Sequence, residues 1–511
     1  MIDPNTNFST KEYDSVYRIT KTTDAENLVT TLTYNARSEL TKTIANPSGF
    51  AITTDFSYND RGELIQTTLP AGGVKTCEFD PNGNQTKCTD PMGGILLWSY
   101  NNRNLMFKST DEAGFETNYT FNGLRMPLTV TNNQGTITSY EYAEKSFLIK
   151  VIEDVGGINR TTQFTHDEYG LVLDTIDPSG TIYRNVYDPA YRIVQNIADV
   201  GGKNITTNTV FDSITRVVKT IDAASFETNY TYDQAFRLTT QSLPDGGLKS
   251  LTYDNLSNVL TATSKVTSTQ NYIVSYEYNK IYQVKKMIED VGGLNITTQK
   301  TYDALHRLAS IIDAKTQTTA YEYDSENRLT KETYADSGII TRTYDVDGRL
   351  TSKTDQNSDV CNYTYNSRDL LTQQTYGSTG IKSFTFDSLR RKTAESDNNS
   401  NNLLVSSSYT FDKLHRHLTC TQQIGSGTPL TDTKIYNDYG EVTQHTLASG
   451  KVIQYTYTAL HQMDAIVSDI GNGTETIANY DYNYDTANSD MRPLVKKKTL
   501  ATGTTISTNF S

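Results

Sequence analysis

The sequence predicts an all-β protein, built as one long array of about 22 antiparallel β-hairpins. An aromatic residue followed by Asp or Asn, with an apolar residue six positions on, recurs along the chain, mostly every 21 residues. Turn residues separate the repeats, and no amphipathic helical period is present. We therefore expect residues 1–511 to be a single continuous array without a separate catalytic domain. The aromatic anchors are Tyr13, Tyr34, Tyr58, Phe79, Tyr100, Phe121, Tyr142, His166, Tyr187, Phe211, Tyr232, Tyr253, Tyr278, Tyr302, Tyr323, Tyr344, Tyr365, Phe386, Phe411, Tyr436, Tyr457 and Tyr484.

The residues before each anchor predict a strand with one buried face. Tyr321 and Tyr323 flank the polar Glu322, and several other units alternate in the same way. A period of two places both tyrosines on one face of a strand. Thr, Tyr, Val and Ile, which are frequent in these segments, also favour pleated structure.

A tight turn follows each anchor, and "FDPNGN" at 79–84 shows it most clearly. Asp80, Pro81 and Gly83 match a type I turn closed by a left-handed glycine. A three-residue loop then opposes each anchor to the residue six positions later. We predict that Tyr323 pairs with Leu329 across one hairpin and shares its face, as Tyr344 does with Leu350.

A second turn joins one unit to the next, and most of the variation in repeat length occurs there. It carries "DPMGG" from Asp90, "DPSG" from Asp177 and "DVGG" from Asp154, Asp199 and Asp290. Asp, Pro and Gly at these positions are typical of tight turns. Each unit is thus two strands and two turns.

The width of such a sheet limits how it can fold. About 44 strands at roughly 4.8 Å each make a strip on the order of 210 Å wide. Sheets twist and do not stay flat over that width. The side chains of 36% hydrophobic residues cannot fill a closed ring of that circumference. We expect the strip either to coil into a hollow, incompletely closed shell or to lie open against a partner.

The segments "YDVDGRL" at 344–350 and "YDSENRL" at 323–329 resemble the YD repeat of Rhs-type polymorphic toxins. The same repeat occurs in the B and C components of insecticidal toxin complexes and in the teneurin shell. The resemblance covers nearly the whole chain and implies a spiral β-shell. In the bacterial members, such a shell encloses a toxic C-terminal segment before delivery.

One part of the family pattern is not found. The family's shell ends in a core segment with a Pro…Asp-Pro-x-Gly-Leu signature, where autoproteolysis releases the cargo, and no such sequence follows the last unit. We therefore expect a slice of a longer protein or a remnant without plug and cargo. No catalytic, cofactor-binding or metal-binding residue is assigned, and no enzymatic activity is expected.

The leading functional hypothesis is a structural shell segment that encloses or helps to deliver a toxic polypeptide. Its partners would be that toxin or effector, the remaining shell segment and a secretion-system component. The rival hypothesis is a cell-surface adhesin that binds carbohydrate through exposed aromatic residues. Genes for a conserved core and an immunity protein beside this one would favour the shell, whereas a neighbouring wall anchor would favour adhesion.

The net charge and the hydropathy of the sequence limit which partners and which cellular locations are expected. A net charge of −13 argues against a nucleic-acid partner. There is no apolar run of 18 residues and no secretory signal after Met1, so a membrane span is not expected. The hypothesis thus predicts a protein that is cytoplasmic before export and reaches the cell surface or medium by a route other than Sec.

Cysteines and histidines have structural interpretations. Symmetric pairing around the turn at 80–84 opposes Cys77 to Lys87 and turns Cys88 to the other face, so we expect no disulfide there. His306, His415 and His461 each stand four residues after an anchor, where other units have the turn glycine. Their separation in sequence argues against a metal site. We expect solvated turn histidines, with His417 beside His415 giving at most adventitious metal binding.

Overall fold

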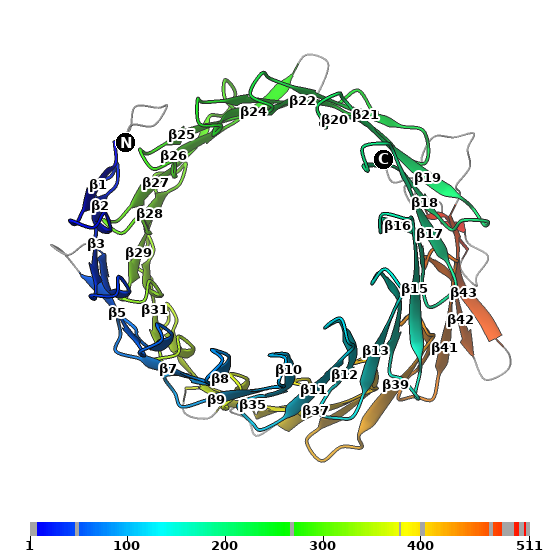
Figure 1. Ribbon diagram of the computed structural model, residues 1–511. Helices are drawn as coiled ribbons and strands as arrows, with labels where there is room; N and C mark the ends of the chain where they lie inside the picture. The colour runs from blue at the N-terminus through cyan, green and yellow to red at the C-terminus, as the bar shows by residue number, and fades with distance from the viewer. Residues whose placement is uncertain are drawn as a thin grey trace. The chain divides into compact units, whose positions relative to one another are not determined.

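The computed structural model describes residues 8–45, 51–265, 270–377, 380–398, 404–469, 474–482, 495–499 and 505–506. All regular secondary structure among these residues is β-strand, so the predicted all-β class is confirmed (Figure 1). The anchor Tyr484 lies outside the described residues.

The strands follow the predicted rhythm of two per unit. In the first half of the chain they are β1 (Thr10–Tyr13), β2 (Ile19–Thr23), β3 (Val29–Tyr34), β4 (Leu40–Ala45), β5 (Ile52–Tyr58), β6 (Leu64–Thr68), β7 (Val74–Phe79), β8 (Gln85–Thr89), β9 (Ile95–Tyr100), β10 (Met106–Thr110), β11 (Glu116–Phe121), β12 (Pro127–Thr131), β13 (Ile137–Tyr142), β14 (Leu148–Glu153), β15 (Arg160–His166), β16 (Val172–Ile176), β17 (Ile182–Tyr187), β18 (Ile193–Ala198), β19 (Ile205–Phe211), β20 (Val217–Ile221), β21 (Glu227–Tyr232) and β22 (Leu238–Ser242).

The second half continues without change of type. Its strands are β23 (Leu248–Tyr253), β24 (Val259–Lys265), β25 (Asn271–Tyr278), β26 (Val284–Glu289), β27 (Ile296–Tyr302), β28 (Leu308–Ile312), β29 (Thr318–Tyr323), β30 (Leu329–Thr333), β31 (Ile339–Tyr344), β32 (Leu350–Thr354), β33 (Val360–Tyr365), β34 (Leu371–Tyr376), β35 (Gly380–Phe386), β36 (Lys392–Asn398), β37 (Leu404–Phe411), β38 (His417–Ile424), β39 (Leu430–Tyr436), β40 (Val442–Thr446), β41 (Val452–Tyr457), β42 (Met463–Asp469), β43 (Thr474–Tyr482), β44 (Val495–Thr499) and β45 (Thr505–Ile506).

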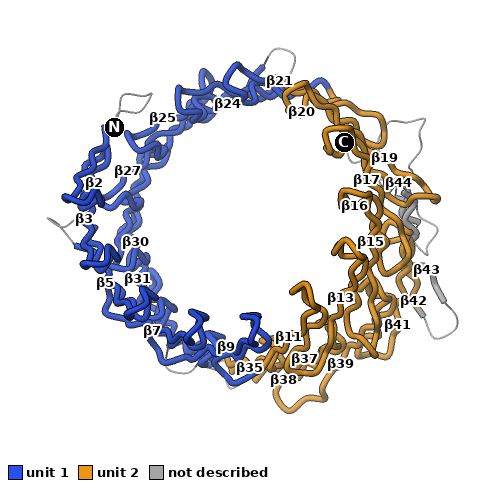
Figure 2. The backbone as a smooth tube through the Cα atoms, in the orientation of Figure 1, with its two compact units in different colours: residues 1–115, 232–241, 246–381 blue, residues 116–231, 242–245, 382–511 orange. Residues whose placement is uncertain are grey.

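The chain forms two compact units, shown in different colours in Figure 2. In each unit we call the long segment that comes first in the sequence the early row, and the later one the late row. Unit 1 has its early row at 1–115 and its late row at 246–381; unit 2 has them at 116–231 and 382–511. Within a row, neighbouring strands pair antiparallel, as from β28 to β34.

The predicted register is confirmed in both hairpins for which it was stated. Tyr323 pairs with Leu329, and Tyr344 pairs with Leu350. In each hairpin the register shifts just before the anchor, between Glu322 and Tyr323 in the first. This irregularity is a β-bulge, which places one extra residue on the second strand. The sequence pattern gave the anchor pair correctly but not the bulge beside it.

The turn after the anchor has the predicted geometry. The backbone N–H of Asp345 donates to the carbonyl of Arg349 at 3.0 Å, and that of Gly348 donates to Asp345 at 3.1 Å. Gly348 has a φ of 88°, in the left-handed region that glycine adopts without steric cost. In other units His, Asn or Ser holds this position with positive φ, as His415 does at 67°.

The cysteine prediction is wrong, and the bulge explains why. Glu78 pairs with Lys87 rather than with Thr86, so Cys77 moves opposite Cys88. The two cysteines form a disulfide across the β7–β8 hairpin. Symmetric counting from the turn missed the extra residue and therefore set Cys88 on the wrong face.

Reducing this disulfide is expected to destabilise its hairpin by about 2–3 kcal/mol, the loop-closure entropy of a short cross-link. The measurement is hydrogen exchange at 74–89 with and without a reductant. The control is a variant in which the free Cys361 and Cys420 are both replaced with serine. This variant keeps the Cys77–Cys88 disulfide. Equal protection of the oxidised and reduced hairpin would contradict the prediction.

The strip is thin. Among the described residues, Cys88 is the only hydrophobic side chain in the buried class, at 5% exposure. The accessible surface is 29078 Å², whereas a compact monomer of 57.1 kDa would expose about 19,000 Å². Most anchors are half-buried. The fold therefore depends on contacts between neighbouring units rather than on a thick core.

Candidate functional site

An ion pair between Asp and Arg closes nine of the described turns that follow an anchor. In the unit at Tyr344, the guanidinium Nε of Arg349 donates to Asp345 Oδ2 at 2.7 Å, while Asp345 Oδ1 accepts the backbone N–H of Arg349 at 2.9 Å. One aspartate thus holds both the backbone and the side chain of the residue four positions on. The same clamp joins Asp14–Arg18, Asp188–Arg192, Asp212–Arg216, Asp233–Arg237, Asp303–Arg307, Asp324–Arg328, Asp387–Arg391 and Asp412–Arg416.

These contacts stabilise the ionised carboxylate. The backbone N–H of Arg237 and, against the opposing effect of burial, its guanidinium hold the pKa of Asp233 below its usual value. In the pair at Arg349, burial alone would lower the pKa of the guanidinium, but Asp345 and then Asp369 raise it. The clamp is therefore charged across the ordinary pH range.

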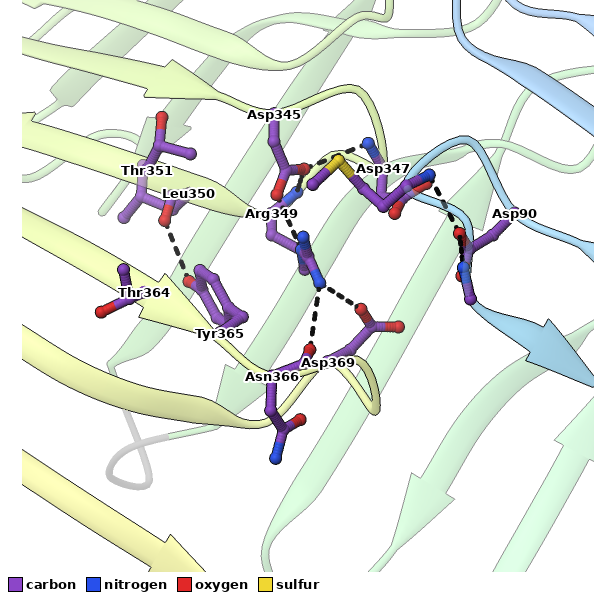
Figure 3. Close-up of polar contacts among 12 residues, drawn as sticks. Asp90, Asp345, Asp347, Arg349, Leu350, Thr351, Thr364, Tyr365, Asn366 and Asp369 are labelled. Atoms are coloured by element: carbon purple, nitrogen blue, oxygen red, sulfur yellow. Dashed lines mark hydrogen bonds and ion pairs between the residues drawn. The ribbon is translucent and has the colours of Figure 1, made fainter. Parts of the chain in front are cut away.

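Most of these arginines also reach the next unit. Arg349 Nη1 donates to Asp369 Oδ1 at 2.7 Å and to the carbonyl of Asn366 at 3.4 Å (Figure 3). Its guanidinium carbon lies 5.2 Å from the ring centre of Tyr365, a cation–π contact. The Tyr365 hydroxyl donates back to the carbonyl of Leu350 at 3.0 Å.

We call this repeating set the Asp–Arg–Tyr ladder. It consists of the Asp–Arg clamp of one unit and the anchor ring of the next. Arginines lie over the following anchor in several other pairs of units: Arg18–Tyr34, Arg192–Phe211, Arg237–Tyr253, Arg307–Tyr323, Arg328–Tyr344, Arg391–Phe411 and Arg416–Tyr436. The ladder explains why the repeat contains Tyr, Asp and Arg, because the side chain of each takes part in joining one hairpin to the next.

The two rows of unit 1 meet through their turns. Turns between units in the early row contact post-anchor turns in the late row, about 255 residues further along the chain. Glu326 Oε1 accepts the backbone N–H of Ala71 at 2.6 Å. Arg368 Nη2 lies 2.7 Å from Asp111 Oδ2, and its guanidinium lies over Phe115. These contacts are polar, so stacking of the rows depends on hydrogen bonds and charge.

The rows of unit 2 meet in the same way. The Asn133 side-chain amide donates to the carbonyl of Ser388 at 2.9 Å, and the Thr181 hydroxyl donates to the carbonyl of Ala459 at 2.9 Å. The chain thus returns alongside itself at a similar sequence interval in both units.

One row contact of unit 1 brings like charges together. Asp347 and Asp90 lie on facing turns (Figure 3), and burial followed by the charge of Asp90 raises the pKa of Asp347. The Asp347 Oδ2 atom is buried and has no hydrogen-bond partner. Such a group is unfavourable to the packing of the two rows.

The prediction that the turn histidines are solvated is confirmed for His415 and wrong for His306 and His461. His415 is exposed, as expected. His306 and His461 are not solvated, because each contacts an aspartate of the opposite row: Asp24 for His306 and Asp177 for His461. The partners stand 282 and 284 residues away in the sequence, so no local pattern revealed them. His417 is half-buried, and burial lowers its pKa.

In the part of the chain that the structure describes, no group of three or more His, Cys, Asp or Glu side chains is arranged to hold a metal ion. No described helix is long and apolar enough to cross a membrane. The expectation that no residue is catalytic stays a prediction.

The role of arginine was not among the features predicted from the sequence. The recurrence of Arg five positions after the anchor is visible in the sequence, and its constant distance from Asp is a signal that could have predicted the clamp. The contact with the next anchor depends on how consecutive hairpins are placed side by side, which residue spacing alone does not show.

With this geometry established, the comparison with protein families is decisive for the repeat. Residues 302–339 and 344–381 match the family model of the RHS repeat. The chain carries RHS repeats. The matched residues contain the Asp–Arg–Tyr ladder at Arg307, Arg328 and Arg349, and the ladder extends to RHS-like hairpins on both sides. No curated protein matches the chain in sequence.

Solved structures similar to this RHS-repeat chain include toxin complexes. A crystal structure of TcdB2-TccC3 has a TM-score of 0.49 and 11% identity, and the match covers 93% of this chain and 38% of that one. TcdB2-TccC3-Cdc42 has a TM-score of 0.48, 12% identity and coverages of 97% and 32%. The Tc holotoxin pore of Photorhabdus luminescens, with a mutated TccC3, has a TM-score of 0.46, 14% identity and coverages of 97% and 31%. The RHS-repeat chain thus spans about a third of the length of these chains.

Proposed function

We propose that this RHS-repeat chain is a non-enzymatic wall segment of a protein shell that encloses or helps to deliver a toxic polypeptide. The observation that carries the proposal is the thin strip joined by the Asp–Arg–Tyr ladder. A wall needs extended surface on both faces, and the chain exposes 29078 Å², about one and a half times the area of a compact monomer.

The stacking of rows supports the same proposal. A single-layered strip leaves the turns of every hairpin exposed. In each unit, turns of the early row instead contact turns of the late row, as Ala71 does with Glu326 and Thr181 does with Ala459. Contacts of this kind close the gap between successive passages of the chain, which a barrier around a polypeptide requires.

The proposal also specifies partners and location. The partners are a toxin or effector polypeptide, the remaining shell segment and a component of a secretion system. The protein would be made in the cytoplasm and then exported to the surface or the medium without Sec. The acidic surface, with a net charge of −13, would repel nucleic acid.

Small-angle scattering of the purified chain, combined with electron microscopy, tests the wall. A compact globule of this length has a radius of gyration of roughly 23–24 Å. We expect a larger radius and a density-depleted centre, because the strip is too wide to fill its own interior. A radius near the compact value with a solid centre would overturn the proposal.

Enclosure is tested separately with a disordered, protease-sensitive reporter fused after residue 511. The expected result is slower digestion of the fused reporter than of the same reporter added as a free peptide. Digestion at equal rates, with the scattering result intact, would leave a wall but contradict enclosure by this chain.

A further inference from the structure

In unit 2, one histidine lies between two carboxylates at a row contact. The early-row turn at 177–181 contacts the late-row turn that follows Tyr457, and His461 of that turn also contacts the turn that follows Tyr436. His461 Nε2 lies 2.9 Å from Asp177 Oδ2, and His461 Nδ1 lies 3.3 Å from Glu441 Oε1. All three side chains are largely buried, at 13%, 8% and 12% exposure respectively.

Whether the buried nitrogen and oxygen atoms of these three side chains all have hydrogen-bond partners depends on the number of protons on His461. A neutral imidazole has one N–H donor, whereas an imidazolium has two. His461 Nδ1 and Glu441 Oε1 are both buried and have no hydrogen-bond partner. If Nε2 donates to Asp177, a neutral ring leaves a lone pair on Nδ1 facing the Glu441 carboxylate. A proton between Nδ1 and Oε1 turns this repulsion into an ion pair.

The early-row groups around the ring are acidic or neutral. On the early row, Asp177 accepts hydrogen bonds from the Ser179 hydroxyl and the backbone of Thr181. These donors and His461 outweigh the effect of burial and hold the pKa of Asp177 below its usual value. Burial, followed by the charge of Asp177, raises the pKa of the neighbouring Tyr183 to about 12.

The late row contributes acidic and aromatic neighbours. The ring of Tyr439 stacks on His461, with 3.3 Å between centroids. Burial and the charge of Glu441 raise the pKa of Tyr457, and Asp199 on the early row adds a further negative charge near Tyr183. The carboxylates, phenols and hydroxyls named here favour a positive charge on the ring. The Arg416 guanidinium opposes it from the turn of Glu441, where its Nη1 donates to the carbonyl of Asn437 at 2.6 Å.

We propose that Asp177, His461 and Glu441 form a proton-dependent latch that holds the two rows of unit 2 together. With a proton between His461 Nδ1 and Glu441 Oε1 these two buried atoms are paired, and without it the Glu441 carboxylate faces a lone pair. The latch is therefore formed in mildly acidic solution and weakens in basic solution, where that proton is lost. At strongly acidic pH it is lost again, because Asp177 becomes protonated.

Unit 1 contains a simpler form of the same contact. His306 occupies the same turn position, four residues after Tyr302, and its Nε2 contacts Asp24 Oδ2. Asp24 holds its turn as Asp177 does, by accepting the N–H groups of Glu26 and Leu28. The pairing of a post-anchor histidine with a turn aspartate of the opposite row thus occurs in the described part of each unit, and unit 2 adds the second carboxylate.

Hydrogen exchange measured by mass spectrometry at pH 5.5 and 8.5, corrected for intrinsic exchange rates, tests the latch. We expect protection at 177–181 and 457–463 to fall about tenfold at the higher pH. The turn at 313–317 is the internal reference, because Asp313 holds it by the same two backbone contacts without a histidine. His461→Gln should lower protection at pH 5.5 and remove most of the pH dependence.

Two further variants decide the interpretation. In Glu441→Gln the amide can donate to a neutral Nδ1, so protection should become equal at the two pH values even if His461→Gln fails to fold. His415→Gln changes an exposed histidine at the equivalent turn position and should behave as the wild type does. Equal wild-type protection at both pH values, or full pH dependence in Glu441→Gln, would overturn the latch.

Discussion

Replacing Tyr344 with alanine is expected to destabilise its hairpin by about 3–5 kcal/mol, the cost of removing a large packed ring. The ring lies beneath the guanidinium of Arg328, whose carbon is 5.0 Å from the ring centre. Its hydroxyl donates to the carbonyl of Leu329 at 2.8 Å. The substitution therefore removes both contacts that the anchor makes with the preceding unit.

The effect should be local. In a linear array, each repeat contacts mainly its neighbours, so hydrogen-exchange protection should fall at 323–365 and persist elsewhere. Tyr344→Phe, which removes only the hydroxyl, should cost about 1 kcal/mol. Tyr17→Ala is the matched control, because that ring is 89% exposed and its loss should be nearly neutral. Equal loss of protection along the whole chain would contradict a repeat array.

Replacing Arg349 with alanine is expected to cost about 2–4 kcal/mol. The side chain is only 16% exposed and is bound by Asp345, Asp369 and the ring of Tyr365. Its removal leaves the half-buried Asp345 carboxylate with backbone donors alone. Chemical denaturation monitored by hydrogen exchange should show the loss at the hairpins on both sides of the arginine.

A conservative variant distinguishes charge from geometry. Arg349→Lys keeps the positive charge but cannot reach two aspartates and a ring with one planar group. It should therefore retain less than half of the stabilisation. Lys285→Ala is the surface control, since its ion pair with Glu277 is 3.8 Å long and the lysine is 52% exposed, so a change below about 0.5 kcal/mol is expected. A cost for Arg349→Ala no larger than that of Lys285→Ala would exclude a structural role for the ladder.

Together, these two substitutions test one physical idea. In a thick core, a single hydrophobic side chain contacts many others, so a substitution there destabilises the whole domain. In this strip, Tyr365 contacts the previous unit through Arg349 and Leu350, and the next pair of units repeats that contact. The free energy of unfolding is then nearly a sum of contributions from the junctions between neighbouring hairpins, as expected for a repeat array.

The sequence by itself determined the local structure. The spacing of Tyr323 and Leu329 predicted their pairing, because a three-residue turn and an alternating strand leave few registers to choose from. The same reasoning failed for Cys77 and Cys88. A bulge adds one residue to the second strand, and the residue pattern around Phe79 is compatible with either pairing.

Only the tertiary structure decided which rows meet. His461 finds Asp177 across 284 residues, and Arg368 finds Asp111 across 257 positions of the sequence. The sequence separation between contacting turns depends on the twist between consecutive hairpins. That twist is small at each step but accumulates over many strands. Repeating turns offer nearly identical donors and acceptors, so composition does not show which pair will face each other. The local unit is fixed by nearest neighbours, whereas the row contacts follow from the summed geometry of all the units between them.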